Sequence, residues 1–332
     1  MKLFSNIFRK LLLYVKNNKF LKNLIYDVIN EDEFTDYYSH ERMLFDSKRV
    51  NSYNDGLGKY VKQGDVVVDL GTGTGILSFL AAKQKPKKIY AIDQSNFIHI
   101  AKDIADYNKI ENIEFVHKNS REFKVQDKVD VIIQEQMGTL LFEENMITNI
   151  LDLKNRVLKE NGLILPGKFS FFVEPAFLLG INTPPLIWEQ KTHGIDFSFL
   201  KENYDSSKFK KQKNGMLYQT TSAFKYFLCS PKPIVNFDLN IMQSQEDLQT
   251  SFNNITKEVV KEGECNAFIV YFHAIFDEEN ILSTAPDLSE TSWDRMLFRT
   301  EKRHYKVGDK INFDFNMDNL VDRATWSLKV KN

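Results

Sequence analysis

Apolar and polar positions divide the chain into two unlike halves. In the first half, segments with helical spacing of apolar residues alternate with short apolar runs, which lie near residues 66–69, 89–93, 113–117 and 128–133. Strands that alternate with helices are typical of a parallel sheet with helices on both faces. We therefore expect a Rossmann-like α/β domain in residues 49–166, with a ligand site beyond the carboxyl ends of its strands.

The pattern changes after Pro166. Apolar residues occupy every second position in residues 311–317 and again, from Ala to Val, in residues 324–330. Such alternation is typical of antiparallel strands with one solvated face. We expect residues 167–332 to form a separate β domain, a barrel or a sandwich. Within it, residues at about 185–215 are expected to form a helical segment that lies outside the β strands and has a basic end.

Residues 1–48 precede the α/β domain. In residues 1–26, an apolar stripe with helical spacing is interspersed with basic residues. The longest apolar run, residues 11–15, is too short for the core of a signal peptide, and no small-residue cleavage site follows. We expect this stripe to pack on the protein or on a partner chain, and contact with a membrane surface is the alternative. The stretch that follows, residues 32–48, is rich in Tyr, His and Arg and is expected to cover the ligand site.

A glycine-rich turn joins the first strand of the α/β domain to the helix after it. The sequence DLGTGTG places Gly71, Gly73 and Gly75 at alternate positions, where they permit a sharp turn and close approach of a ligand to the main chain. The dinucleotide motif G-x-G-x-x-G requires its third glycine at Ile76, and the P-loop requires a Lys after its last glycine. The pattern therefore indicates either a bare structural turn or a nucleoside cofactor without a phosphate chain.

Two aspartates favour the cofactor. Asp69 ends the first strand and is expected to face the amino-acid end of S-adenosylmethionine together with the glycine turn. Asp93 ends the second strand, about twenty residues beyond Gly71, where an acid can bind ribose hydroxyls. We therefore predict an S-adenosylmethionine site.

Acidic residues gather where the fourth strand ends. Glu135 follows that strand, Gly138 permits a reversal, and Glu143 and Glu144 open the next helix. Paired carboxylates suit a planar cation with several N–H donors, and guanidinium is the best match. For Glu143 and Glu144 the alternative is a charge that complements the helix dipole, which we expect to hold for one of them. An acid at the end of a buried strand is costly unless it has a partner, so Glu135 favours function.

The net charge and the cysteine content disfavour a nucleic-acid-binding protein and a metalloprotein. The formal net charge of −1 provides no general attraction to nucleic acid. Two cysteines, Cys229 and Cys265, are too few for a metal cluster, and no paired Cys or His residues have zinc spacing. We expect a cytoplasmic protein without a metal and without a nucleic-acid partner.

At this point several segments resemble the protein arginine methyltransferase family, and the likeness covers nearly the whole chain. The segment DLGTGTGILS resembles the family's cofactor motif, QEQMGTLLFEENM its double-glutamate hairpin, and TAPDLSETSW its C-terminal active-site loop. IWEQKTHGIDFSFLKE is similar to the start of its dimerisation arm, and GDKINFDFNMDNLVDRATWSLKV to its closing barrel strands. The hairpin motif is the specific one among these.

The resemblance implies a methyltransferase that forms a homodimer through a helical arm and ends in a β-barrel. It implies contacts with S-adenosylmethionine by five residues: Arg49 on the carboxylate, Asp93 on the ribose, Glu122 beside the adenine, Met146 near the sulfonium, and His40 as a cover. It makes Glu135 and Glu144 a guanidinium clamp. Without the resemblance, Arg49 fits a solvated helix face equally well.

The chain departs from the family pattern around the substrate. Gln136 stands where the family hairpin has Trp. In the C-terminal loop the family has His-Trp, and this chain has Ser292 followed by Trp293. Asp46, which would pair with that His, is retained and is expected to lack this partner. In its N-terminal motif the family has tyrosines at two positions where this chain has Asn30 and Phe34. We expect a wider or wetter pocket on this side.

Three functions remain open. The first is methylation of a guanidino nitrogen of arginine in a protein or peptide. The second is methylation of a small amine or guanidine. The third is a catalytically silent, cofactor-binding scaffold, which retention of both hairpin acids disfavours.

Overall fold

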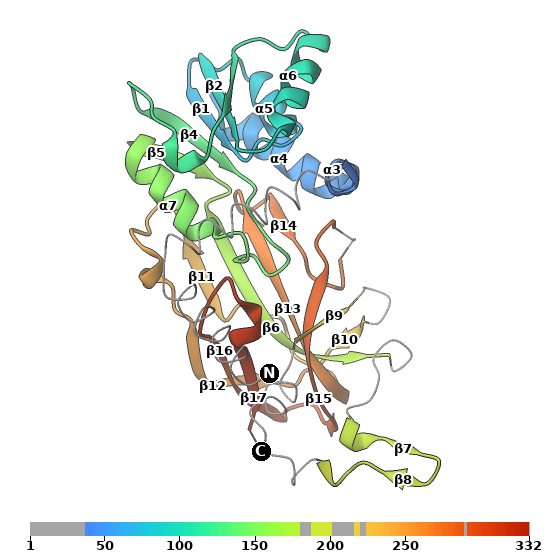
Figure 1. Ribbon diagram of the computed structural model, residues 1–332. Coiled ribbons are helices and arrows are strands. Elements are labelled where there is room, and N and C mark those ends of the chain that lie inside the picture. Colours follow the sequence, from blue (N-terminus) through green and yellow to red (C-terminus); the bar gives the residue numbers. More distant parts are fainter. Residues whose placement is uncertain (1–36, 180–186, 201–215, 220–223, 289–290, 332) are drawn as a thin grey trace, which may run out of the picture.

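A computed structural model describes residues 37–179, 187–200, 216–219, 224–288 and 291–331 (Figure 1). The apolar stripe expected in residues 1–26, and the substituted positions Asn30 and Phe34, lie outside the described residues. In the described part of the chain, no helix has both the length and the apolar character to cross a membrane.

The first half of the chain forms the expected parallel sheet. Its strands, in the spatial order β3-β2-β1-β4-β5, are β3 (Ile113–His117), β2 (Lys88–Asp93), β1 (Val66–Leu70), β4 (Val129–Gln134) and β5 (Leu158–Leu165). All neighbouring strands pair in parallel. The chain order changes direction between β1 and β4, and in sheets of this kind ligands bind at that point, beyond the carboxyl ends of the strands.

Helices cover this sheet with their apolar faces. They are α4 (Ser47–Tyr60), α5 (Ile76–Ala82), α6 (Phe97–Tyr107) and α7 (Met146–Val157). A further helix, α3 (Tyr37–Phe45), lies beside α4 and buries only His40. In α6 the buried residues Phe97, Ala101 and Ala105 recur every four positions, which places them on one face of the helix. Asp46 caps α4 by accepting a hydrogen bond from the backbone N–H of Arg49 at 2.9 Å.

The second half forms two antiparallel sheets in a barrel-like arrangement. The larger contains β6 (Lys168–Leu178), β9 (Met216–Gln219), β10 (Phe224–Phe227), β11 (Val235–Asp238), β13 (Gly263–Ile275), β14 (Ile281–Ser283) and β15 (Arg295–Tyr305). The smaller contains β12 (Ser251–Glu258), β16 (Lys310–Met317) and β17 (Trp326–Val330). Aromatic rings fill the space between them, as where Phe268 of β13 lies 4.8 Å from Phe313 of β16. The alternation in residues 311–317 correctly predicted which side chains of β16 face this core.

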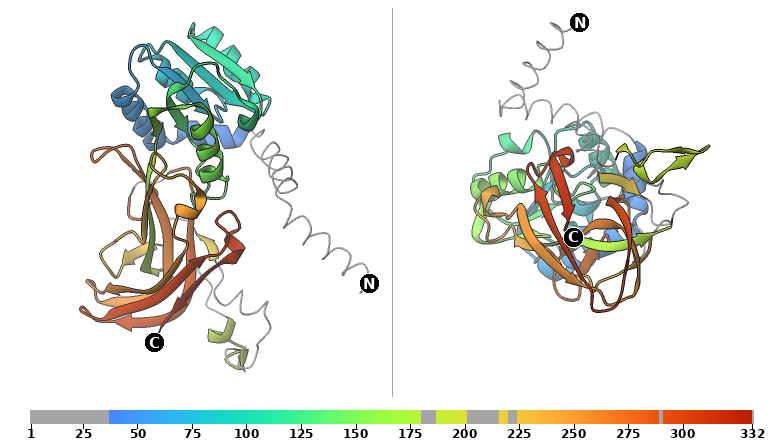
Figure 2. Two further views of the ribbon diagram at one scale, coloured as in Figure 1. Left: turned by 90° about the vertical axis from the view of Figure 1, so that its left-hand side faces the viewer. Right: turned by 90° about the horizontal axis from the view of Figure 1, so that it is seen from below.

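The two domains share one hydrophobic core and lie end to end (Figure 2). The ring of Tyr53 on α4 meets that of Phe276 edge to face, 5.1 Å away. A Cβ atom at Gly56 would lie 2.3 Å from the Phe276 ring, so only glycine permits this approach. Lys154 of α7 donates to the backbone carbonyls of Leu239, Asn240 and Met242. These contacts hold the β domain against the edge of the sheet where β4 ends.

The described start of the expected helical arm is not a helix. Residues 187–200 contain a short 3-10 turn (Ile187–Glu189) and a hairpin of β7 (Lys191–Thr192) and β8 (Ile195–Asp196). The hairpin loop consists of His193 and Gly194, both with positive φ, as a tight hairpin turn requires. The helical expectation is therefore wrong for these residues, and residues 201–215 lie outside the described residues. The hairpin projects from the end of the β domain that is remote from the α/β domain (Figure 1).

Candidate active site

A cavity opens at the carboxyl ends of β1, β2 and β4, and residues of α3 and α4 close one side of it. Seven residues predicted from the sequence line this cavity: His40, Arg49, Gly71, Gly73, Asp93, Glu135 and Glu144. The cavity therefore brings the predicted cofactor residues and the predicted clamp together. Six other predicted residues lie outside its lining: Asp69, Gly75, Glu122, Met146, Ser292 and Trp293.

The glycine turn has left-handed backbone at all three glycines, with φ of 73°, 53° and 88°. A Cβ at Gly73 would come within 3.0 Å of the His40 ring, and one at Gly75 within 2.4 Å of the Phe79 ring. Gly71 and Gly73 form the cavity wall. Gly75, by contrast, serves the packing of the turn on α5, so its absence from the lining has a steric reason.

Asp69 supports this turn from below. Its Oδ2 accepts hydrogen bonds from the hydroxyls of Thr72 and Ser78, each at 2.7 Å. Burial raises the pKa of the Asp69 carboxyl, and the two hydroxyl bonds oppose that rise. Its buried Oδ1 has no hydrogen-bond partner among the described residues. Asp69 thus shapes the turn, whereas the sequence had predicted direct contact with the cofactor.

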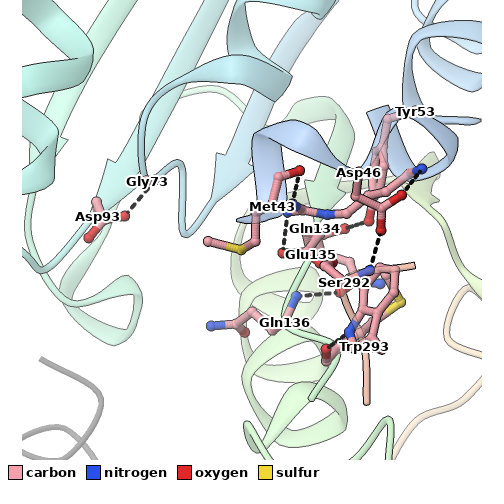
Figure 3. Close-up of polar contacts among 12 residues, drawn as sticks. Met43, Asp46, Tyr53, Gly73, Asp93, Gln134, Glu135, Gln136, Ser292 and Trp293 are labelled. Atoms are coloured by element: carbon pink, nitrogen blue, oxygen red, sulfur yellow. Dashed lines mark hydrogen bonds and ion pairs between the residues drawn. The ribbon is translucent and has the colours of Figure 1, made fainter. Parts of the chain in front are cut away.

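Asp93 is fixed at the far end of the cavity. Its Oδ2 accepts the backbone N–H of Gly73 at 2.8 Å (Figure 3). Its Oδ1 accepts both the backbone N–H and the hydroxyl of Ser95. Since a carboxylate oxygen has two acceptor positions, Oδ2 retains one for a ribose hydroxyl.

Two predicted cofactor contacts are corrected. Glu122 is exposed and lies at the end of a 3-10 turn (Ser120–Glu122), whereas Ser120 and Arg121 of the same turn line the cavity. Asn119 begins this turn by accepting the backbone N–H of Arg121, and this cap directs the first two residues inward. Met146 is fully buried in the apolar core at the start of α7. Met43 of α3 lines the cavity instead.

Arg49 and Glu135 form a buried ion pair. Arg49 Nη2 lies 2.7 Å from Glu135 Oε2, and Arg49 Nη1 donates to the carbonyl of Met43 at 3.1 Å. The Arg49 Nε is buried and has no partner among the described residues. Burial raises the pKa of the Glu135 carboxyl, and the positive charge of Arg49 opposes the rise. The residue expected on the cofactor carboxylate is therefore in direct contact with the clamp.

The two adjacent glutamates of the hairpin point to different places. Glu143 accepts the backbone N–H of Leu140 at 3.1 Å and lies 3.4 Å from the guanidinium of Arg323 in the β domain. Gly138 packs against it, since a Cβ there would be 2.9 Å from Glu143 Cβ. Glu144 lines the cavity together with Glu135. Glu143 thus closes the hairpin, and the cavity receives Glu135 and Glu144.

Comparison with known proteins agrees with this geometry. A family model described as a methyltransferase domain matches residues 61–171, and the arginine methyltransferase oligomerization subdomain matches residues 186–324. The protein arginine N-methyltransferase 6 of Danio rerio is 29% identical over 277 residues, which are 80% of this chain and 77% of the relative. The protein arginine N-methyltransferase 1 of Schizosaccharomyces pombe is 27% identical over 283 residues, 82% of this chain and 80% of the relative. Over most of its length the chain is similar to protein arginine methyltransferases.

Solved structures of family members have the same architecture. The PRMT1 enzyme-prozyme heterotetrameric complex of Trypanosoma brucei with AdoHcy matches with a TM-score of 0.74 and 26% identity, over 90% of this chain and 94% of that chain. The protein arginine methyltransferase 10 of Arabidopsis thaliana matches with a TM-score of 0.72 and 19% identity, over 90% of this chain and 93% of that chain. At that lower identity the second match is evidence for the fold alone.

The C-terminal loop of this chain is held without the His of the arginine methyltransferase pattern. Asp46 Oδ2 accepts the backbone N–H of Ser292 at 2.6 Å, and Arg42 donates to the backbone carbonyl of Ser292 at 2.8 Å. Trp293 donates its indole N–H to the carbonyl of Met137 in the hairpin at 2.5 Å (Figure 3). As expected, Asp46 has no His partner at this position, and the backbone N–H of Ser292 takes the place of the imidazole. No sequence pattern indicated that Arg42 would contact this loop.

Proposed function

We propose that the chain transfers a methyl group from S-adenosylmethionine to a guanidino nitrogen of arginine in a protein or peptide. The observation that carries this proposal is that Glu135 and Glu144 line the same cavity as Gly71, Gly73 and Asp93. A guanidinium held by the two acids would face a cofactor held by the glycine turn. Similarity to protein arginine methyltransferases supports the same reaction.

The cavity residues fit the cofactor. Asp93 would bind the ribose, and Arg49 would bind the carboxylate, because its buried Nε is available and each Nη has a second hydrogen. S-adenosylmethionine supplies an electrophilic methyl group on its sulfonium when it is bound. The chain holds the two reactants in line, which removes much of the entropic cost of their encounter.

The clamp addresses the weakness of guanidinium as a nucleophile. Its positive charge is spread over three nitrogens, and it remains protonated at working pH. Two carboxylates draw that charge toward the nitrogens they bind and leave the third with more of its lone pair. Glu135 already binds a guanidinium in this structure, that of Arg49. Its position therefore suits such a group. Methyl transfer would form the N–CH3 bond as the S–CH3 bond breaks with its electron pair left on sulfur, and the attacking nitrogen would lose a proton.

We also propose that the chain is a homodimer. Residues 186–324 match the oligomerization subdomain of the family. The described start of the arm exposes Ile195 and Phe199 at 61% and 68%, and Phe45, at the end of α3, is exposed at 90%. Burial of apolar side chains of this size by a partner chain is favourable, because it removes apolar surface from water. The arm of one subunit and α3 of the other are complementary candidates for that contact.

An acceptor screen tests the proposed reaction. The protein is incubated with methyl-labelled S-adenosylmethionine and an arginine-rich peptide, the same peptide with Lys for Arg, free arginine or a small guanidine. Label in the arginine peptide and none in the lysine peptide is expected. Label only in free guanidines would retain guanidine chemistry and refute a protein acceptor, whereas label only in amines would refute both.

A further inference from the structure

One arginine outside the cavity lining holds part of the cavity wall. Arg156 lies in the last turn of α7, and its guanidinium donates to two backbone carbonyls of the segment that follows β3. Its Nη2 donates to the carbonyl of Ser120 at 2.9 Å, and its Nη1 donates to that of Phe123 at 2.6 Å. Ser120 is the first residue of the 3-10 turn, and Phe123 is the residue that follows the turn. One side chain therefore spans the whole turn.

Asp152 orients this guanidinium. It precedes Arg156 by one turn of α7, and its Oδ2 accepts hydrogen bonds from Nε at 3.1 Å and from Nη2 at 2.6 Å. Both side chains are partly exposed, at 31% for Arg156 and 42% for Asp152, so the ion pair by itself adds little stability. Its effect is geometric. A guanidinium is a planar fork, and fixing its plane directs the other N–H groups at the two carbonyls.

The turn that Arg156 supports forms one end of the cavity. Ser120 and Asn119 line the cavity there, and Asn119 Nδ2 donates at 2.7 Å to the Oε1 of Gln94, the residue directly after β2. Within the turn, the backbone N–H of Glu122 donates to the Asn119 carbonyl and that of Phe123 to the Ser120 carbonyl. Such short 3-10 segments have poor hydrogen-bond geometry. Support from outside therefore matters for keeping this wall in one conformation.

We propose that Arg156 is a positioning residue for the cofactor, which holds the turn Ser120–Glu122 in the conformation that fits the nucleoside of S-adenosylmethionine. This inference rests on the proposed function, which places the ribose at Asp93. Arg156 acts through the two carbonyls and makes no contact with the cofactor. Because α7 begins soon after Glu144, one helix carries the clamp at its start and the support of the nucleoside site in its last turn.

The test measures ligand binding in variants that differ in the donors at position 156. Arg156→Met keeps the stem and removes every donor, whereas Arg156→Lys keeps the charge without a planar fork for both carbonyls. We expect the Kd for S-adenosylhomocysteine, measured by calorimetry, to rise roughly threefold to tenfold in Arg156→Met, the equivalent of about one hydrogen bond. The rise should be smaller in Arg156→Lys. Methylthioadenosine, which has the nucleoside but no amino-acid end, should lose affinity by the same factors.

A second readout needs no ligand. Amide hydrogen exchange of Glu122 and Phe123 in the free protein should be faster in Arg156→Met than in the wild type, since their N–H groups form the bonds of the turn. Lys88→Ala is the matched control, because Lys88 forms a partly exposed ion pair with Glu114 at 2.6 Å and lies at the start of β2, away from the cavity. It should leave both affinities and the exchange of these amides unchanged.

Equal Kd values for Arg156→Met and the wild type, measured well below both thermal midpoints, would overturn the inference. A loss confined to S-adenosylhomocysteine, with methylthioadenosine unaffected, would also overturn it, because the effect would then lie at the amino-acid end. Failure of the wild type to bind S-adenosylhomocysteine would refute the cofactor site of the proposed function, and the inference with it. The wild-type measurement thus separates the two failures.

Discussion

The carboxylate of Asp46 joins the start of α4 to the backbone of Ser292, 246 residues away in the chain. Its Oδ2 accepts the Ser292 N–H at 2.6 Å, and its Oδ1 caps α4 through the N–H of Arg49. One buried side chain thus connects the helix that carries Arg49 to the C-terminal loop. The contact uses a peptide group, so the identity of the side chain at position 292 does not determine it.

This contact makes a prediction that separates Ser292 from Asp46. Ser292→Ala should change kcat/KM by no more than about twofold, because the N–H remains. Asp46→Ala should lower kcat/KM at least tenfold, since the loop loses its anchor, and should lower stability by about 1 kcal/mol through loss of the helix cap. Steady-state kinetics and urea unfolding measure the two effects. Equal losses in both variants would contradict the role given to the peptide group.

If Glu135 and Glu144 form the guanidinium clamp, substitution of either should affect turnover more than substitution of the neighbouring Glu143. Glu135→Gln and Glu144→Gln should each lower kcat by roughly two to four powers of ten, since removal of one partner of a buried charge pair costs about 3 to 5 kcal/mol. Glu143→Gln should be mild, because Glu143 contacts Leu140 and Arg323 outside the cavity lining. Single-turnover kinetics with saturating cofactor isolates the chemical step. Greater sensitivity at Glu143 than at Glu144 would show that the clamp is assigned one position out of register.

Part of this site was readable from the sequence because the signals are local. Asp93 and Glu135 each follow an apolar run, and the end of such a run marks the sheet edge where ligands bind. Glu122 was misplaced because its direction depends on the 3-10 turn capped by Asn119, which has no periodicity to read. Met146 was misplaced because a helix start can face either the core or the cavity.

Long-range contacts through the backbone were beyond the sequence. The bond between Asp46 and Ser292 depends on a peptide N–H, which every residue except Pro has, so no side-chain pattern announces it. Arg42, which contacts the same residue through its carbonyl, was missed for the same reason. The hairpin at His193 and Gly194 is a different case. Its glycine, a turn-forming residue, is visible in the sequence, but it lies in a stretch that was predicted to be helical.

His273 predicts a destabilisation in acid. It lies on β13 opposite Ser283, and burial, together with Lys48, lowers its pKa to about 4. Between pH 6.5 and 4 the unfolded chain binds a proton at this residue that the folded chain does not, so stability is lost as the pH falls through this range. His273→Gln should reduce the slope of unfolding free energy against pH in this window. Equal slopes for the variant and the wild type, measured by urea unfolding, would contradict the assignment.

The proposed homodimer predicts a change of mass. Deletion of residues 186–212 should yield a monomer with reduced turnover, because the arm can no longer cover the other subunit. Phe45→Asp should weaken the dimer from the opposite side, since it places a charge on the exposed end of α3. Light scattering at micromolar concentration measures both. A monomeric wild type under these conditions would refute the proposal.

Tandem mass spectrometry of an arginine-rich peptide after reaction with methyl-labelled S-adenosylmethionine tests the reaction most directly. Wild-type protein should place the label on a guanidino nitrogen of arginine. Glu144→Gln, with cofactor bound to the same occupancy, should place roughly a hundredth of that label or less, as loss of about 3 kcal/mol implies. Label found on lysine, on a hydroxyl or on carbon, or equal label from the two proteins, would contradict guanidine methylation by this clamp.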